Sequence, residues 1–167
     1  MALNLELKIS INSKKNIIDK ILCGGGKYIS SLNQIDTYFT FNKGLLKLRN
    51  QNGENQLIKY NRNETETDRW SNYSVLFLKG EEVLKYLTDL FDIEVEVKKE
   101  RKLYIYKNTR IHIDKVSRLG NYLELETMVD KISLEEAKNE FNEVVDFLKL
   151  DLEHQIRKSY RDLLLKV

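Results

Sequence analysis

The stretch RIHIDKVSRLGNYLELE, which starts at Arg110, alternates in hydropathy on both sides of a short turn. Before the turn Arg110, His112 and Asp114 alternate with isoleucines and a valine, and after it Glu124 and Glu126 alternate with leucines. Successive side chains of a β-strand point to opposite faces, so this pattern predicts a hairpin with one apolar and one charged face. The charged face is either an ordinary solvent-facing surface or the lining of an interior space.

Similar alternation recurs along the chain, and helical spacing with capping residues separates some of the strands. Strands are predicted at about 3–11, 28–41, 44–51, 56–62, 73–78, 93–106, 109–117 and 121–129. Helices are predicted from Ser13 to near Cys23, over 81–91, from Ser133 onward and over 156–166, and the polar segment 61–72 is predicted to be a loop. The GGG at 24–26 follows a helix and lacks the spacing of a phosphate-binding loop, so it is interpreted as a helix stop.

The composition limits the function classes. The 28 basic and 26 acidic residues give a net charge of +2, which argues against a nucleic-acid polymer or an anionic membrane as partner. There is no apolar run long enough to span a bilayer, so we expect a soluble, cytoplasmic protein. Residues 1–167 fit a single domain that is a monomer or a homodimer. The lone Cys23 is expected to be a small buried side chain rather than a nucleophile.

Polar residues at alternate positions of several strands suggest that the charged faces of these strands line one common space. Basic side chains recur at i and i+2 on strand after strand, which is costly to gather in one place unless a polyanion compensates them. Eight strands are also the number at which a closed barrel first has a usable interior. The residues of this parity are Glu6, Lys8, Gln34, Asp36, Tyr38, Lys47, Arg49, Tyr60, Arg62, Lys99, Arg101, Arg110, His112, Asp114, Glu124 and Glu126.

The chain resembles the CYTH group, also called triphosphate tunnel metalloenzymes, which includes class IV adenylyl cyclases and thiamine triphosphatases. The resemblance rests on the ordered set NLELK, NQIDTYF, GLLKLRN, LIKYNR, KKERKLY, RIHIDKVSRLGNYLELE and IRKSYRDLL, which runs nearly the whole chain. It implies an α+β fold, namely an eight-stranded antiparallel β-barrel with flanking helices, whose tunnel is lined by basic and acidic side chains. On this basis, the charged face of the hairpin that starts at Arg110 lines the tunnel.

The resemblance also implies a small-molecule triphosphate substrate and a Mg²⁺ or Mn²⁺ cofactor. A triphosphate carries about four negative charges, and arginine and lysine side chains can neutralise its oxygens. The expected substrate-binding residues are Lys8, Lys47, Arg49, Tyr60, Arg62, Lys99, Arg101 and Arg110. The expected catalytic residues are Lys8, Arg49, Arg110 and Asp114, and the expected metal ligands are Glu6, Glu124 and Glu126. Asp114 either binds metal or orients Arg110 and His112, and His112 is either a base or a structural residue.

One position departs from the pattern of the group. Its hallmark is E-x-E-x-K, and the matching residues here are Asn4, Glu6 and Lys8. An amide oxygen can bind Mg²⁺ but brings no charge, so this replacement affects metal affinity or stoichiometry rather than the fold.

The resemblance leaves the reaction open. A class IV adenylyl cyclase-like enzyme would convert ATP to cyclic AMP and pyrophosphate. The alternatives are a triphosphatase acting on thiamine triphosphate, a nucleoside triphosphate or tripolyphosphate, and a non-catalytic module that binds nucleotide or polyphosphate. A pocket for the adenine base would distinguish the cyclase from the other two functions. Trp70, Tyr73 and Tyr104 are candidates for this pocket.

Overall fold

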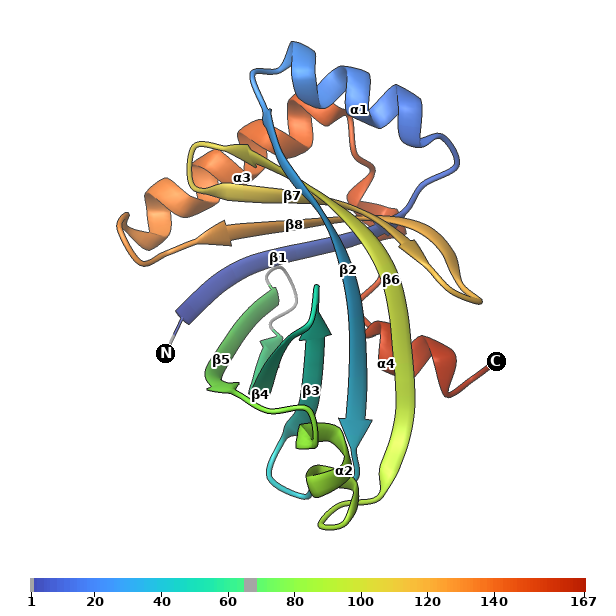
Figure 1. Ribbon diagram of the computed structural model, residues 1–167. Helices are drawn as coiled ribbons and strands as arrows, with labels where there is room; N and C mark the ends of the chain where they lie inside the picture. The colour runs from blue at the N-terminus through green and yellow to red at the C-terminus, as the bar shows by residue number, and fades with distance from the viewer. Residues whose placement is uncertain (1, 65–68) are drawn as a thin grey trace.

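The computed structural model describes residues 2–64 and 69–167, except for the side chains of residues 2, 62–64 and 69–71. The strands of this part form a closed antiparallel barrel in the order β1-β5-β4-β3-β2-β6-β7-β8, which confirms the predicted eight-stranded fold (Figure 1). The strands are β1 (Ala2–Ser10), β2 (Lys27–Phe39), β3 (Leu45–Gln51), β4 (Glu54–Glu64), β5 (Arg69–Leu78), β6 (Ile93–Tyr106), β7 (Thr109–Val116) and β8 (Gly120–Met128).

Short turns, and pairing between strands that are far apart in the sequence, close the barrel. Between β3 and β4, Asn52 and Gly53 both have positive φ angles, of 50° and 88°, as a two-residue hairpin turn requires. The opening hairpin pairs β7 with β8, and β1 then pairs with both β8 and β5. Because β1 joins two strands that are distant in sequence, no edge strand is left open among the described residues.

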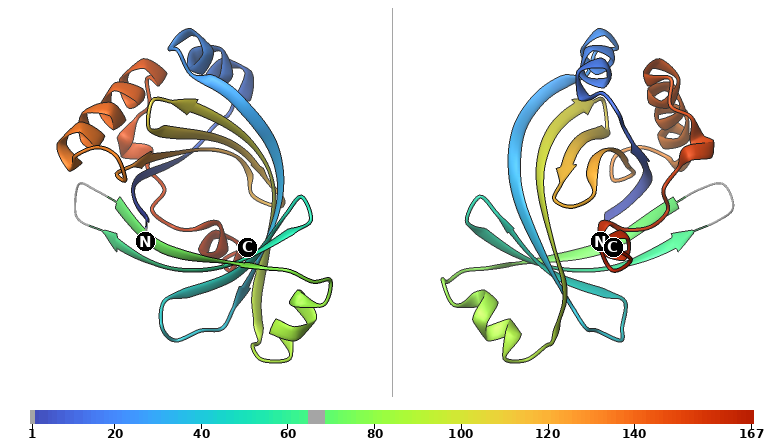
Figure 2. Two further views of the ribbon diagram at one scale, coloured as in Figure 1. Left: turned by 60° about the vertical axis from the view of Figure 1, so that its left-hand side comes forward. Right: turned by 90° about the vertical axis from the view of Figure 1, so that its right-hand side faces the viewer.

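Two helices cover one side of the barrel. α1 (Lys14–Cys23) and α3 (Leu134–Leu148) lie on the same side of the barrel, as the two views of Figure 2 show. They pack on the outward apolar side chains of β1, β7 and β8. Ser13 and Ser133 cap these helices through hydrogen bonds to backbone N–H groups. The outward leucines and isoleucines therefore form the main core, and the opposite parity of the same strands faces inward.

The other helices are short. α2 (Val83–Thr88) covers outward side chains of β2 and β3, and a 3₁₀ turn (Leu152–His154) precedes α4 (Tyr160–Leu164). α4 packs beside β6 at the end of the barrel where several tyrosines gather. None of the described helices is long and apolar enough to cross a membrane.

Two local predictions are wrong. The segment 61–72 is not all loop, because β4 runs to Glu64 and β5 begins at Arg69. Polar strands that extend beyond the core lack the apolar alternation by which strands are recognised. Cys23 is exposed rather than buried, because it lies in the last turn of α1 on the side away from the barrel.

Candidate functional site

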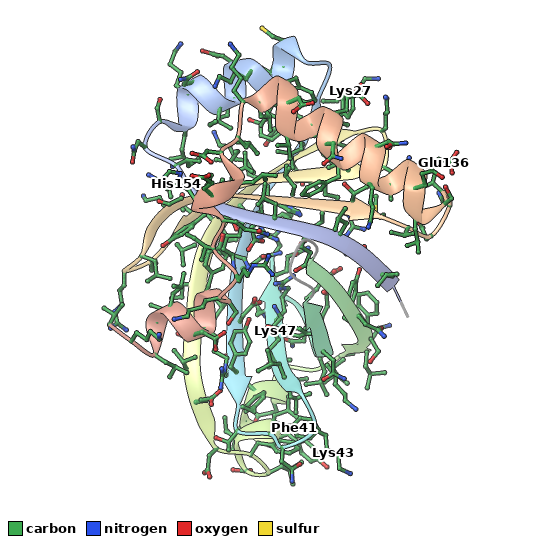
Figure 3. All side chains as sticks on the ribbon, turned by 180° about the vertical axis from the view of Figure 1, so that it is seen from behind. Lys27, Phe41, Lys43, Lys47, Glu136 and His154 are labelled. Atoms are coloured by element: carbon green, nitrogen blue, oxygen red, sulfur yellow. The ribbon has the colours of Figure 1, made fainter. Side chains whose placement is uncertain are left out.

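The barrel encloses a cavity of about 570 Å³ that side chains from all eight strands line, together with Ser159 and Tyr160 from the C-terminal segment. Most of the predicted site residues meet here, and Figure 3 shows Lys47 inside the ring of strands. The predicted residues that line the cavity are Glu6, Lys8, Lys47, Arg49, Tyr60, Lys99, Arg101, Arg110, Glu124 and Glu126. The side chain of Arg62 lies outside the described residues, and Asp114 is buried beneath the lining.

The cavity wall is divided into three sectors that follow the strand order. The basic sector comprises β3, β2 and β6 and presents Lys47, Arg49, Lys99 and Arg101. The acidic sector comprises β7, β8 and β1 and presents His112, Glu124, Glu126 and Glu6. The apolar sector comprises β5 and β4 and presents Tyr73, Val75, Phe77, Ile58 and Tyr60.

A buried carboxylate organises the basic sector. Arg49 donates from Nε and Nη2 to the two oxygens of Asp36, at 2.7 and 2.8 Å, and Lys47 donates to Oδ2 at 2.9 Å. Lys99 lies 3.6 Å from the same oxygen. These cations come from β3 and β6, the two neighbours of β2, so the strand order brings three positive charges onto one negative charge.

The closeness of these charges shifts the pKa values of Asp36, Lys47 and Lys99. Burial alone would raise the pKa of Asp36, but Arg49, Lys47 and Lys99 together hold that pKa well below its usual range. Burial and then the charge of Arg49 lower the pKa of Lys47 to about 7, against the pull of Asp36. Burial and Arg101 likewise lower the pKa of Lys99. Lys47, Arg49 and Lys99 therefore gather around one carboxylate, an arrangement that favours the binding of a further anion.

Asp114 holds Arg101 in place. Arg101 donates to the two oxygens of Asp114 at 2.7 and 2.6 Å and also contacts Glu124. Burial opposes the charge of Arg101, but Asp114 and Glu124 raise its pKa well above the usual value. Tyr160 donates its hydroxyl to Asp114 Oδ2 at 2.8 Å. The sequence suggested that Asp114 orients Arg110 and His112 or binds metal, whereas its oxygens are occupied by Arg101 and Tyr160.

The C-terminal segment completes the wall, which the sequence did not predict. The ring of Tyr160 lies under two cations, with the Nζ atoms of Lys8 and Lys99 at 4.1 and 5.3 Å from its centroid. Lys8 also donates to the carbonyl of Lys158 at 2.9 Å and lies 3.2 Å from Glu124. The motif IRKSYRDLL thus contributes side chains to the site as well as forming a short helix.

The acidic sector brings carboxylates of neighbouring strands together. Glu6 lies opposite Glu126 in the β1–β8 register, and His112 lies opposite Glu124 in the β7–β8 register. Carboxylates are the oxygen ligands that Mg²⁺ and Mn²⁺ prefer, so the chemistry of these side chains fits such an ion. Within the ranges described, no three carboxylate, imidazole or thiol groups converge on one point, since Glu124 is drawn towards Lys8 and Arg101.

Glu126 is held less tightly than Glu124. Its Oε2 lies 3.6 Å from Nη1 of Arg110 and 3.4 Å from Nε2 of His112. Burial would raise the pKa of Glu126, but His112 and then Arg101 hold that pKa far below its usual range. Glu126 is therefore ionised and lies among contacts that an incoming cation can replace.

The apolar sector was not predicted from the sequence. Ile58 lies opposite Val75, and Gln56 lies opposite Phe77, in the β4–β5 register. Phe77 is two-thirds exposed in the open cavity, which leaves a large apolar surface available. Of the three aromatic residues considered for a base pocket, Tyr73 lines this sector, the side chain of Trp70 lies outside the described residues, and Tyr104 packs on the outer face of the barrel under the helices.

Proteins with similar sequences and structures share this architecture. A protein of Methanocaldococcus jannaschii with the name "Putative adenylate cyclase" is 26% identical over 96% of this chain and 98% of its own length. The PH1012 protein of Pyrococcus horikoshii superposes with a TM-score of 0.84 at 24% identity, covering 96% of this chain and 98% of its own. A "putative adenylyl cyclase" from Hippeastrum that "reveals a dominant" triphosphatase activity gives a TM-score of 0.67 at 12% identity, covering 99% of this chain and 96% of its own.

A comparison with protein families points the same way. Residues 2–160 match the CYTH domain, a span that begins at β1 and ends at Tyr160, the residue that completes the cavity wall. The sequence motifs, the closed barrel and the charged lumen agree with this match, and the chain belongs to the CYTH domain family.

Proposed function

We propose that this protein binds a nucleoside triphosphate and a divalent cation in the barrel and converts ATP to cyclic AMP and pyrophosphate. The observation that carries the proposal is the division of one cavity into a basic, an acidic and an apolar sector. A nucleoside triphosphate has the complementary parts, namely a polyanionic tail, oxygens that a metal ion can share, and a flat base with apolar faces. Tripolyphosphate would leave the apolar sector uncovered.

The basic sector provides the site for the triphosphate tail. Arg49 and Arg101 are each held by a buried carboxylate, so their remaining N–H groups are fixed before the substrate arrives. Lys47 and Lys99 add two further charges beside Asp36, which also pairs with Arg49. These residues bind the tail and stabilise the negative charge that builds up on the leaving pyrophosphate.

The acidic sector provides the site for the cation. Glu6 and Glu126 are the ligands in this proposal, with Glu124 as a third donor if it leaves Lys8 and Arg101. A Mg²⁺ or Mn²⁺ ion held there would neutralise phosphate oxygens and polarise the α-phosphate. Arg110, whose side chain is about one-third exposed, lies beside Glu126 and can turn onto a phosphate oxygen.

The apolar sector favours cyclisation over the other reactions. Cyclisation requires the ribose 3′-oxygen to attack the α-phosphorus in line with the departing pyrophosphate. An anchored base limits the positions of the ribose, and Val75 and Phe77 offer it an apolar face beside the tyrosines of β4 and β5. Fixing both ends of the substrate reduces the entropy cost of the attack.

Hydrolysis to a diphosphate and phosphate is the second candidate. The same cations would stabilise the transfer of a terminal phosphoryl group to water, and the fold is shared with the Hippeastrum protein, which is described as having a dominant triphosphatase activity. The two reactions differ in their products, so product analysis separates them.

The test is a substrate panel with product identification. ATP, GTP, thiamine triphosphate and tripolyphosphate are incubated with Mg²⁺ or Mn²⁺, and the products are separated by chromatography. Cyclic AMP with an equal amount of pyrophosphate supports the proposal, whereas a diphosphate with phosphate supports the second candidate. Binding of ATP without any product would overturn both and leave a binding module.

Two controls are part of this test. Activity in excess chelator should be lost, because the proposed reaction needs the cation. Glu126→Gln should lose most activity while its unfolding transition stays close to that of wild type, since Glu126 has only loose contacts to Arg110 and His112. The exposed Glu135→Gln, in the first turn of α3, is the matched control.

A further inference from the structure

His112 is the one residue of the acidic sector that the proposed function does not use. It lies on β7 with about 5% of its surface exposed, and its side chain lines the cavity. Among the described residues, neither ring nitrogen of His112 has a hydrogen-bond partner. A buried polar group without a partner costs about 1–3 kcal/mol, so a group in the cavity that bonds to this ring would be favoured.

The distance between His112 and Glu126 indicates which ligand. Nε2 of His112 lies 3.4 Å from Oε2 of Glu126, and no hydrogen bond joins them. Two ligands that occupy neighbouring positions on one small divalent ion, each at about 2.1 Å, lie roughly 3 Å from one another. The two side chains are therefore close to the spacing of a ligand pair without having moved.

The surroundings of this pair are suited to a cation. Glu6 lies opposite Glu126 in the β1–β8 pair and Glu124 lies opposite His112 in the β7–β8 pair, so three carboxylates share this part of the wall with the ring. Asn4, which is 2% exposed and lines the same cavity, contributes an uncharged oxygen. Compared with the E-x-E-x-K pattern, this sector has one anionic donor fewer and has a nitrogen donor on a neighbouring strand.

We propose that His112 and Glu126, with Glu6, form a mixed nitrogen–oxygen site that prefers a first-row transition ion such as Mn²⁺ or Co²⁺ to Mg²⁺. This inference rests on the proposed function, because it assigns the metal to the same sector. Mg²⁺ binds oxygen ligands and water almost exclusively, whereas imidazole is a good ligand for transition ions, whose affinities rise along the series from Mn²⁺ to Co²⁺.

Pulsed electron paramagnetic resonance of bound Mn²⁺ tests the nitrogen ligand directly. The protein is prepared without any purification tag and loaded with Mn²⁺, both alone and with the non-reactive α,β-methylene analogue of ATP. The sequence contains two histidines, so His154→Gln leaves His112 as the only one. His154 is exposed, pairs with Asp151 and does not line the cavity, so its replacement is the matched control.

The expected result is a ¹⁴N coupling in the wild type and in His154→Gln that changes when the latter is grown with ¹⁵N-histidine. His112→Gln should lose the coupling and bind Mn²⁺ about tenfold or more weakly, with little change in Mg²⁺ affinity. Coupling that is absent from the wild type, or that survives in His112→Gln, would overturn the inference. The isotope experiment needs no substitution at position 112, so it decides the question even if His112→Gln fails to fold.

The failure of this inference and that of the proposed function give different results. If Mn²⁺ binds without a nitrogen coupling and Glu126→Gln abolishes binding, the carboxylate site stands and only the role of His112 is wrong. If the wild type binds no Mn²⁺, either alone or with the ATP analogue, the metal site of the proposed function is wrong as well.

Discussion

Asp36 on β2 and Arg49 on β3 face one another across the strand pair and share two hydrogen bonds, of 2.7 and 2.8 Å, beneath the floor of the cavity. Lys47 and Lys99 approach the same carboxylate, so one anion sets the positions of three cations. The four side chains are largely buried, so solvent screens their interactions little. We expect this arrangement to govern the stability of the protein and its dependence on pH.

Replacing the central carboxylate should destabilise the empty protein. Asp36→Asn leaves three buried cations without a counter charge, and breaking a buried pair typically costs about 3–5 kcal/mol. Urea unfolding should show this loss, and tripolyphosphate should recover more stability in the variant than in the wild type. The control Asp19→Asn breaks an exposed pair with Lys15 and should cost less than about 1 kcal/mol. Equal unfolding midpoints for the two variants would contradict the prediction.

Triphosphate binding should weaken as the pH rises above 7. The pKa of Lys47 is about 7 in the empty barrel, and a bound polyanion favours the charged form, so binding above this pH requires proton uptake. Calorimetry in buffers of different ionisation enthalpy should detect the proton. Lys47→Arg, which stays charged, should remove this uptake. Equal proton uptake by both proteins at pH 8 would show that another group titrates.

The same lowered pKa predicts the opposite trend for the stability of the empty protein. An unfolded lysine titrates near 10.5, so between pH 7 and that value the unfolded chain binds the extra proton. The contribution of Lys47 to the free energy of unfolding therefore rises with pH over this window. Lys47→Met should flatten the rise, and the pH profile of urea unfolding measures it.

Removal of Lys99 and removal of Arg101, two neighbouring cations on β6, should have different effects on the stability of the protein. Lys99→Met removes a charge that burial and Arg101 disfavour, so the empty protein should keep or gain stability while its affinity for a triphosphate falls. Arg101→Met leaves Asp114 buried with Tyr160 as its remaining hydrogen-bond donor and should cost about 3–5 kcal/mol. Unfolding curves and triphosphate titrations of both variants check this. A similar loss of stability in the two would be the contrary result.

Position 4 should control metal affinity. Asn4→Glu restores the hallmark of the family and adds negative charge beside the acidic sector, so it should lower the metal concentration that gives half-maximal activity. The activity of both proteins is titrated against Mg²⁺ and Mn²⁺ at a fixed ATP concentration. A half-saturating concentration that is unchanged or higher would mean that residue 4 is not a ligand position.

The alternation of side chains along each strand predicted which residues line the interior, because a barrel wall has only an inner and an outer face. Once Glu124 and Arg101 were placed on the inner face, the period of two fixed every other inward residue on those strands. The partners within the lumen were not predictable, since Asp36 meets Lys99 only through the pairing of β2 with β6 and Asp114 meets Arg101 only through that of β6 with β7. Such pairings depend on strand order, which one strand's sequence does not contain.

The apolar sector escaped prediction for a different reason. On β4 and β5 both faces carry apolar side chains, with Ile58 and Val75 directed inward and Leu57 and Leu76 outward. Alternation is the signal for a half-buried strand, and it is absent where both faces are apolar. The role of Tyr160 was not predicted, because the sequence of its five-residue helix is that of an ordinary amphipathic helix. Its hydrogen-bond partner Asp114 is also 46 residues away in the sequence.

The bonds between Lys8 and the segment 156–158 have a consequence for how the protein is made. The backbone N–H of Ile156 donates to the carbonyl of Lys8 at 2.8 Å, and Lys8 Nζ donates to Lys158, 150 residues further along the chain. On the ribosome the strand that carries Lys8 is synthesised before these partners, so it stays unpaired until β5, β8 and then this segment have emerged. The complete anion site can therefore assemble only after residues 156–160 have been made, and a nascent chain stalled before Tyr160 would lack the ring that packs against Lys8 and Lys99.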